Sequence, residues 1–478
     1  MGRVGCMHVY SHRVLLPAEG GGLQVKPALI GIDGGMITSI RAEDEPFGDS
    51  LGPEVDHLGD TLLTPAFVNA HSHIAMSVYR GLLSGAHMRG NVVESFYFQV
   101  EAALDGADIR AFARMGAYES LLAGVGTIWD HYYGGLELAQ GIDDVGLTAA
   151  VALTLQDLNG PGVAYLEDQL AATEALAGSK AWQEKGIVAA LGPHATDTVS
   201  DGLWRLVGDL RAKLQLPIHA HVAQSIEEVE RSFENHGCSP VERLHRLGLL
   251  GGPQAFLLVH SLFVSDGDLE RIDPASDCLG FCPFSQAQFC FPAHFSSWRR
   301  RGAKVLVGTD CGASNDTMNV QQELRLVAGT PGLAGTWSQA RDRFAEAGTL
   351  AAAQSLQDYR VDVFDQSVSD LSHEALLAMV WGDAADLHPQ LPVGAIETGR
   401  FANLVAWNLD DPALWPAPDP LRALVMGDAT QAIEQVMIRG QWRGERGRFR
   451  QSIVASDDYR EARREAQGRL AALLARID

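Results

Sequence analysis

The central part of the chain alternates short apolar runs with longer stretches of helical periodicity. A short apolar run rich in β-branched side chains is typical of a buried strand, and intervening helices are typical of crossovers between parallel strands. Eight parallel strands close a barrel, so we predict an α/β fold with a (β/α)8 TIM-like barrel; a doubly wound open sheet is the competing fold. The eight runs are Pro65–Ala70, Thr127–Asp130, Leu147–Leu153, Ile187–Gly192, Pro217–His221, Phe256–His260, Leu279–Cys282 and Lys304–Thr309.

Both ends of the chain show a different pattern, in which short alternating pieces are separated by glycine-containing turns. Such pieces are typical of antiparallel strands. We predict that residues 1–63 and 391–455 pair into one small composite β-sandwich domain, and that the barrel spans residues 64–390. The alternating pieces are Leu23–Ile32, Met36–Ile40, Ala402–Trp407 and Ala432–Ile438.

Two further segments have helical patterns outside the repeated strand and helix units. Residues 331–372 resemble an insertion whose helical pattern is broken by Pro331 and Gly332, and we expect a flap over a binding site or an oligomer contact. Residues 456–478 contain an amphipathic stretch rich in Ala, Leu, Arg and Glu, which predicts a C-terminal helix on the barrel exterior.

The amino-acid composition indicates which classes of binding partner to expect. The 478 residues include 37 Lys and Arg against 60 Asp and Glu, a net charge of -23, which repels phosphate backbones and anionic membranes. We therefore expect a small-molecule substrate and neither a nucleic-acid nor a membrane partner. The six cysteines form no CxxC pair, the first residues lack a signal-peptide pattern, and no apolar run is long enough to span a bilayer; these features favour a cytoplasmic protein with reduced thiols.

Polar residues that bind metals close several of the predicted strands. His71-Ser72-His73 follows the first run and His219-Ala220-His221 ends the fifth, while His260 and Asp310 close the sixth and eighth. Side chains alternate along a strand, so each His-x-His pair directs two imidazoles to one side. A single pair is weak evidence, but two pairs and a costly buried carboxylate at strand ends predict one divalent metal site at the barrel mouth.

This arrangement resembles the amidohydrolase superfamily, and within it the branch of cytosine, guanine and S-adenosylhomocysteine deaminases and triazine hydrolases. The likeness covers nearly the whole chain; Ala66 stands where glycine is usual and Asn403 where aspartate is common. It rests on the segments Thr64-Pro65-Ala66-Phe67-Val68-Asn69-Ala70-His71-Ser72-His73, Gly192-Pro193-His194-Ala195, Val307-Gly308-Thr309-Asp310 with Ser314-Asn315-Asp316, and Gly394–Trp407.

The resemblance implies a role for each site residue. The metal ligands would be His71, His73, His221 and Asp310, with Asp310 and His260 as the catalytic pair. Zinc is the first candidate, and iron or manganese suits the same donors. His194 and Gln224 would contact substrate, His219 would be a supporting or core histidine, and the protein would be a homo-oligomer.

One departure bears on the reaction. Gln224 stands where these deaminases usually carry a glutamate that shuttles a proton, and an amide does not titrate near neutral pH. We predict a metal-dependent hydrolase that displaces an amino group from an electron-poor carbon of a nitrogen heterocycle. Hydrolysis of an amide, urea, carbamate or C–Cl bond is the alternative that Gln224 favours; a non-catalytic scaffold is a remote third, disfavoured by the complete ligand set.

Several neighbouring residues allow weaker expectations. Asp130 and His131 read as structural, and Cys311 as a small space-filling residue rather than a nucleophile. The aromatic run 96–98 would stack on a planar ring or pack in the core. Ser285 and Gln286 stand where the branch often lines its pocket.

Overall fold

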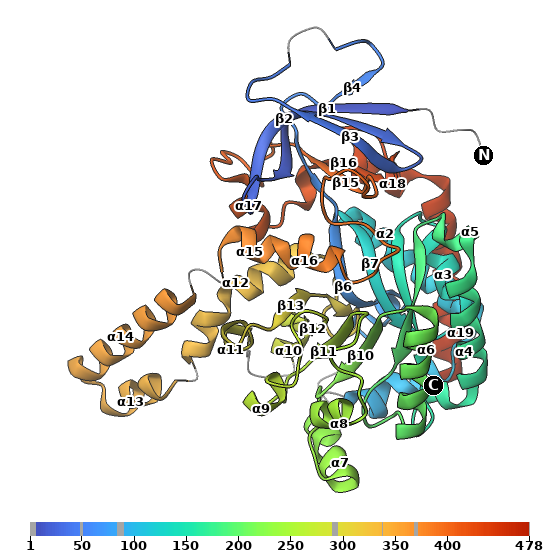
Figure 1. The fold of residues 1–478 in the computed structure, drawn as a ribbon, viewed down its shortest axis with the longest axis vertical. Helices are drawn as coiled ribbons and strands as arrows, with labels where there is room; N and C mark the ends of the chain where they lie inside the picture. The colour runs from blue at the N-terminus through green and yellow to red at the C-terminus, as the bar shows by residue number, and fades with distance from the viewer. Residues whose placement is uncertain are drawn as a thin grey trace.

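The central strands form a closed parallel barrel in the computed structural model, which describes residues 6–47, 51–83, 90–288, 295–336, 338–367 and 371–477. Neighbours are hydrogen-bonded in the order β13-β12-β11-β10-β9-β8-β7-β6-β14, so the predicted TIM-like barrel is confirmed (Figure 1). The strands are β6 (Phe67–His73), β7 (Val125–Tyr132), β8 (Thr148–Leu155), β9 (Ile187–Pro193), β10 (Ile218–Val222), β11 (Phe256–His260), β12 (Asp277–Phe281), β13 (Lys304–Val307) and β14 (Asp310–Cys311).

The barrel closes where the eighth strand is divided into β13 and β14. Asp310 pairs with Ser72 of β6, and the amide of Thr309 donates to the carbonyl of His71 at 3.0 Å. A Cβ atom on Gly308 would lie 2.7 Å from the backbone nitrogen of His71, so only glycine allows this approach. The close approach brings β14 and its aspartate directly beside the two histidines of β6.

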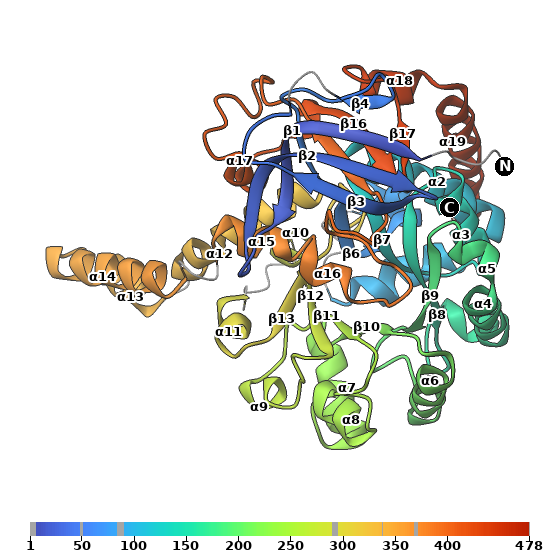
Figure 2. The ribbon, with the colours of Figure 1, turned by 45° about the horizontal axis from the view of Figure 1, so that its top comes forward.

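Helices surround the barrel on its outer side (Figures 1 and 2). Alternation along the strands divides the core: Val68, Trp129 and Leu257 belong to the inner cluster, while Phe67, Ile128 and Leu258 belong to the cluster that includes helix residues. The helices are η1 (Ile74–Tyr79), η2 (Val93–Tyr97), α1 (Phe98–Glu101), α2 (Gly106–Leu122), α3 (Leu136–Asp143), η3 (Pro161–Tyr165), α4 (Leu166–Gly178), α5 (Lys180–Gln183), α6 (Asp201–Leu214), α7 (Ile226–His236), α8 (Pro240–Arg246), α9 (Asp266–Leu269), α10 (Pro283–Gln288), α11 (Phe295–Arg300), α15 (His373–Ala378), α16 (Gly382–Ala385), α17 (Pro420–Met426), η4 (Thr430–Ala432) and α18 (Phe449–Ala455).

Strands from both chain ends form a second, mixed sheet above the barrel (Figure 2). Their order is β17-β16-β15-β5-β1-β2-β3, with β4 beside β1, and only the pairings of β1 with β4 and β5 are parallel. The pairing of the two ends is as predicted; the domain limits at 63, 391 and 455 stay a prediction. The strands are β1 (Met7–Pro17), β2 (Leu23–Asp33), β3 (Met36–Ala42), β4 (Val55–His57), β5 (Leu62–Pro65), β15 (Leu404–Trp407), β16 (Ile433–Ile438) and β17 (Gln441–Arg443).

The predicted insertion contains a helical hairpin that projects from the body of the molecule, formed by α13 (Gln339–Ala347) and α14 (Leu350–Ser367) (Figure 1). The expected break at Pro331 and Gly332 is wrong, because α12 continues from Val320 to Thr336. Proline at 331 removes the amide that would bond to the carbonyl of Val327, and the Thr330 hydroxyl donates to that carbonyl at 2.8 Å instead. A flap or oligomer role for the segment stays a prediction.

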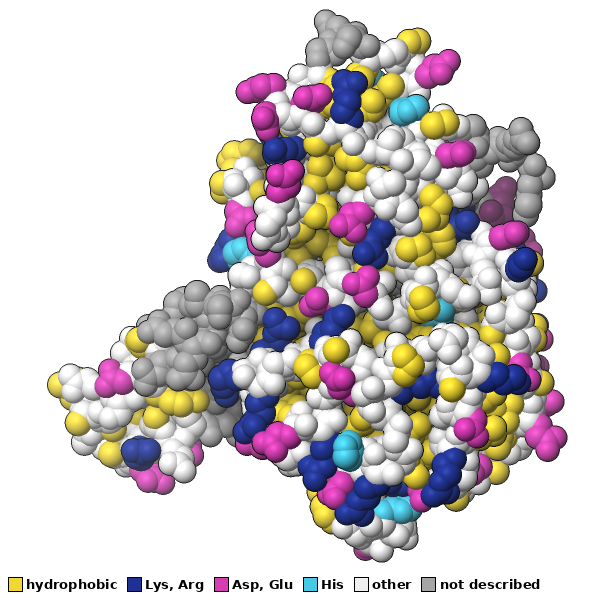
Figure 3. Space-filling view, viewed as in Figure 1, with side chains coloured by type: hydrophobic (Ala, Val, Ile, Leu, Met, Phe, Trp, Pro, Cys, Tyr) yellow, Lys and Arg dark blue, Asp and Glu magenta, His cyan; other side chains and the backbone are white. Residues whose placement is uncertain are grey.

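The C-terminal helix α19 (Asp457–Ile477) packs along α2 on the outside of the barrel. Asp108 of α2 is buried and accepts hydrogen bonds from Arg469 at 3.2 Å and Arg476 at 2.5 Å. On the face shown in Figure 3, acidic and basic side chains are interspersed over the barrel helices. Among the described residues, no helix is both long and apolar enough to cross a membrane.

Candidate metal centre and active site

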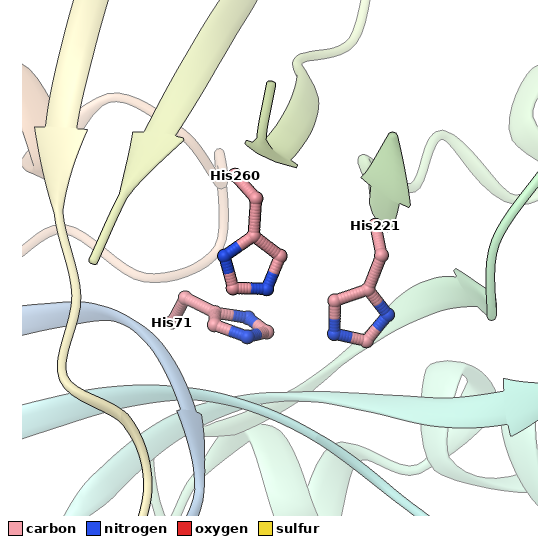
Figure 4. A group of neighbouring side chains, drawn as sticks. All are labelled: His71, His221 and His260. Atoms are coloured by element: carbon pink, nitrogen blue, oxygen red, sulfur yellow. The ribbon is translucent and has the colours of Figure 1, made fainter. Parts of the chain in front are cut away.

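The candidate ligands converge at the carboxyl ends of β6, β10, β11 and β14. Nε2 of His71 and of His73 lie 3.7 Å and 3.6 Å from Oδ1 of Asp310, and Nε2 of His221 lies 3.3 Å from Nε2 of His73. Figure 4 shows His71, His221 and His260 facing one another from three strands, with ligand atoms within 4.8 Å of one another. The structure thus brings together all four predicted ligands and His260.

Hydrogen bonds on the far side of each ring determine where its lone pair lies. Nδ1 of His221 lies 2.9 Å from the carbonyl oxygen of His194, and Nδ1 of His73 bonds to the carbonyl oxygen of His131. A carbonyl only accepts, so each Nδ1 carries the hydrogen and each Nε2 keeps a lone pair. Among the described residues, the buried Nε2 of His71 has no hydrogen-bond partner. Buried lone pairs that face one common point fit a divalent cation.

The candidate ligands have the protonation states that a divalent metal requires, with neutral imidazoles and an ionised carboxylate. Burial lowers the pKa of His71 to about 3 and that of His260 to about 4, so both imidazoles are neutral at physiological pH. For Asp310, burial by itself would raise the pKa, but the neighbouring imidazoles of His71, His260 and His73 favour the carboxylate and lower its pKa. Neutral imidazoles beside one carboxylate match the donor set of zinc, iron or manganese sites.

Two serine hydroxyls orient the carboxylate of Asp310. Ser285 donates to Oδ2 at 2.6 Å and Ser314 donates to the same oxygen at 3.0 Å, which leaves Oδ1 facing His71 and His73. Asp310 has a φ of 61°, a left-handed conformation that costs free energy and that turns the side chain into the mouth of the barrel. Ser285 stands at a position that often lines the pocket in the branch that the sequence resembles; here it bonds to Asp310, and the role of Ser314 was not predicted.

A layer of buried polar residues supports the ligands from below. Nε2 of His219 lies 2.7 Å from Nδ1 of His71, and the Nδ1 of His131 bonds to the carbonyl oxygen of His219 at 3.1 Å. Asp130 accepts from the Ser72 hydroxyl at 2.9 Å and from the amide of Ile74 at 2.7 Å. The pair Asp130 and His131 therefore fixes the ends of the ligand-bearing strands, in line with the structural role expected for it.

A small cavity of about 50 Å³ opens above the ligands and joins a wider pocket of about 270 Å³. His194 and Gln224 line both, so each lies where a substrate would contact it. Tyr97 and Phe98 line the small cavity, whereas Phe96 lines neither. Gln286 lines neither volume, and its side-chain amide donates to the carbonyl of His260 at 3.4 Å.

Two further residues of the small cavity differ in chemistry. Burial raises the pKa of the Cys311 thiol to about 12, which makes this cysteine a poor nucleophile. Burial raises the pKa of Glu101 to about 8, although Tyr132 and Tyr133 hydrogen-bond to it. Glu101 was not predicted as a pocket residue, because a single glutamate in a helical stretch carries no sequence signal.

Comparisons with known proteins agree with this fold. A 5-methylthioadenosine/S-adenosylhomocysteine deaminase of Halobacterium salinarum is 29% identical over 417 residues, covering 86% of this chain and 87% of the relative. The deaminase of the same name from Thermodesulfovibrio yellowstonii is 24% identical over 412 residues, with coverage of 86% and 87%. In fold, the chain is similar to an adenosine deaminase from Xanthomonas campestris with bound zinc, at a TM-score of 0.77, 21% identity and 98% coverage of both chains. The model of the amidohydrolase family matches residues 62–356, more than half of the sequence, and the chain therefore belongs to that family.

Proposed function

We propose that this protein is a metal-dependent aminohydrolase that replaces an amino group on an electron-poor ring carbon with a hydroxyl group from water, with adenine nucleosides as first candidate substrates. The convergence of three imidazole lone pairs and one anionic carboxylate beside an open pocket carries this proposal. The deaminases among the relatives support it.

The cation would be held by His71, His73, His221 and Asp310. Zinc is the first candidate, because the adenosine deaminase from Xanthomonas campestris that is similar in fold contains bound zinc. A divalent cation there would lower the pKa of a water molecule from 15.7 toward roughly 7. Iron and manganese fit the same donors.

Asp310 is the residue placed to move protons. Its Oδ2 accepts hydrogen bonds from two serine hydroxyls, and the carboxylate would accept a proton from the attacking water and pass it to the departing nitrogen. The C–O bond forms, the C–N bond breaks and ammonia leaves. The Nε2 of His260, without a hydrogen-bond partner among the described residues, is positioned to hydrogen-bond the reacting atoms.

Gln224 would orient the ring without exchanging a proton, because its amide does not titrate near neutral pH. Hydrolysis of an amide, urea, carbamate or C–Cl bond is not favoured by the comparisons, since the sequence relatives reported above are named deaminases. A non-catalytic scaffold would have no use for the converging ligand set.

The proposal also includes the cellular location and the oligomeric state of the protein. The cysteines in the described part of the chain, Cys6, Cys238, Cys278, Cys282 and Cys311, are free thiols, which supports a reducing cytoplasmic location. We propose a homo-oligomer that acts on a small molecule, with neither a nucleic-acid nor a membrane partner, given the net charge of -23.

The test is a substrate screen on zinc-loaded protein in water enriched in oxygen-18. Adenosine, 5′-methylthioadenosine, guanine, cytosine, a chlorinated triazine and an aryl amide would be incubated separately, with ammonia, chloride and product mass followed together. We expect ammonia and one solvent oxygen in the product for at least one compound. Release of chloride, or of an acid from an amide, with no ammonia from any aminated ring, would overturn the proposal.

A further inference from the structure

The wider pocket beside the candidate metal centre has a wall of carboxylates. Glu94, Asp197, Glu227 and Glu228 all line this volume of about 270 Å³. Because the pocket shares His194 and Gln224 with the cavity above the ligands, it would receive the part of the substrate remote from the reacting carbon. The inference that follows rests on the function proposed above.

A single arginine behind this wall does not balance its charge. Nη1 of Arg231 lies 2.5 Å from Oε1 of Glu94 and 2.8 Å from Oδ2 of Asp197. Arg231 does not itself line the pocket, and its one positive charge is shared by two carboxylates. Within the described ranges, no lysine or arginine lines either the wider pocket or the small cavity.

Glu227 of α7 adds a further negative charge to the wall, and Glu228 beside it adds one when it is ionised. Glu228 accepts from the amides of Ala223 and Gln224 at 3.0 Å and 2.7 Å, so it also holds Gln224 at the pocket. Glu227 stands in the first turn of α7, and no cationic side chain in the described part of the protein pairs with it. Burial, with the nearby charge of Asp197, raises the pKa of Glu228 to about 7, as expected where carboxylates crowd together.

The amino terminus of α7 does not offset these charges. A helix amino terminus attracts anions when its amides are free. Here the Ser225 hydroxyl accepts from the amide of Glu228 at 3.1 Å, and Glu227 and Glu228 supply the negative charges that this end of the helix prefers. An anion that approaches this end of the helix would therefore meet the carboxylates of Glu227 and Glu228.

We infer that the pocket selects substrates whose remote group is neutral or cationic, and disfavours those that carry a carboxylate or phosphate there. Like charges held close together in a partly desolvated pocket repel, and this repulsion discriminates between otherwise similar ligands.

Three adenosine derivatives of similar size test the inference: 5′-amino-5′-deoxyadenosine, adenosine 5′-carboxamide and adenosine 5′-carboxylate. We expect the kcat/KM of the carboxylate to lie at least roughly tenfold below that of the carboxamide at low salt, and the gap to narrow as salt screens the charges. Equal kcat/KM for the carboxylate and the carboxamide would overturn the inference.

Calorimetric binding of the same three compounds separates this inference from the proposed function. If none of them releases ammonia, the function fails for adenine nucleosides, while weaker binding of the carboxylate still supports the charge preference. Binding of the carboxylate as tight as that of the carboxamide, or no measurable binding of any of the three, overturns it.

A matched pair of variants on α7 locates the effect. Glu227→Gln removes a pocket carboxylate, whereas Glu230→Gln removes an exposed one three residues further along that does not line the pocket. We expect Glu227→Gln to raise the ratio of carboxylate to carboxamide kcat/KM by roughly threefold or more, and Glu230→Gln to leave it unchanged. An equal response of both variants would show that only the overall net charge acts.

Discussion

Nδ1 of His71 lies 2.7 Å from Nε2 of His219, and both rings are fully buried. The first His-x-His pair thus depends on the second for its orientation, across the barrel from β6 to β10. If Nε2 of His71 is to keep its lone pair for a metal, its Nδ1 carries the hydrogen and His219 accepts it.

His219→Leu tests this dependence. Leucine keeps an apolar volume but removes the acceptor, so we expect zinc affinity to fall by about 10–100-fold while the fold is retained. Competition with a coloured chelator measures the affinity, and circular dichroism reports the fold. His388→Gln is the matched control, because His388 is also buried but bonds to Ala189 and Gln390 rather than to a candidate ligand. Zinc affinity equal to that of the unmodified protein would contradict the prediction.

Asp310→Asn tests the proton-transfer role. Asparagine tolerates the left-handed φ of 61°, so the backbone is expected to stay in place. The amide cannot accept and return a proton, and we expect kcat to fall by at least about 10³-fold while part of the bound zinc remains. Steady-state kinetics and elemental analysis on the same sample check both parts. A kcat within tenfold of the unmodified enzyme would exclude Asp310 as the proton carrier.

Gln224→Ala separates orientation from proton transfer. Gln224 lines the cavity with His73, His221 and Asp310, so its loss should weaken substrate binding. Because the amide takes no proton, we expect KM to rise by roughly fivefold and kcat to stay within about threefold, with an unchanged pH profile. Substrate titrations across a pH series give all three quantities. A fall in kcat of about 10² or more, or a shifted pH profile, would show that Gln224 takes part in the chemistry.

The barrel could be predicted because each of its strands is a separate apolar run. The runs ending at His221 and His260 close with a residue that faces the site, and the run ending at Ala70 is followed directly by His71. Strand alternation then determines which side each imidazole occupies. The pairing of the two chain ends was predicted from the alternating pieces at both ends, but β5, the strand that joins the ends by pairing with β15, was not among those pieces.

Other features depend on contacts that no local pattern contains. The helix through Pro331 persists because Thr330 replaces a lost donor, and proline alone predicts a break. Ser314 and Glu101 enter the site only once η2, α1 and the turn after β14 are folded against the barrel mouth. The resemblance implied a supporting or core role for His219, but its contact with His71 depends on the distance from β10 to β6, which the sequence does not hold.

His388 makes the pH dependence of stability testable away from the candidate ligands. Its Nε2 donates to the carbonyl of Ala189 at 2.9 Å and its Nδ1 accepts from the amide of Gln390 at 3.1 Å, so the second of these bonds requires the neutral ring. Burial lowers the pKa of His388 from 6.5 to about 4. Above pH 6.5 the ring is neutral in the folded and unfolded chains, and its contribution to stability is complete.

Between pH 6.5 and about 4 the unfolded chain binds a proton that the folded chain refuses, so the free energy of unfolding falls as the pH falls. The loss attributable to His388 is at most about 3 kcal/mol over this range. We expect His388→Gln to be less stable than the unmodified protein at pH 7. Between pH 6.5 and 4.5, we expect its free energy of unfolding to fall less steeply with falling pH, with a slope that corresponds to up to one fewer proton bound on unfolding. Urea unfolding of both proteins at closely spaced pH values measures the two slopes. Parallel slopes would mean that His388 takes up its proton in the folded state as readily as in the unfolded chain.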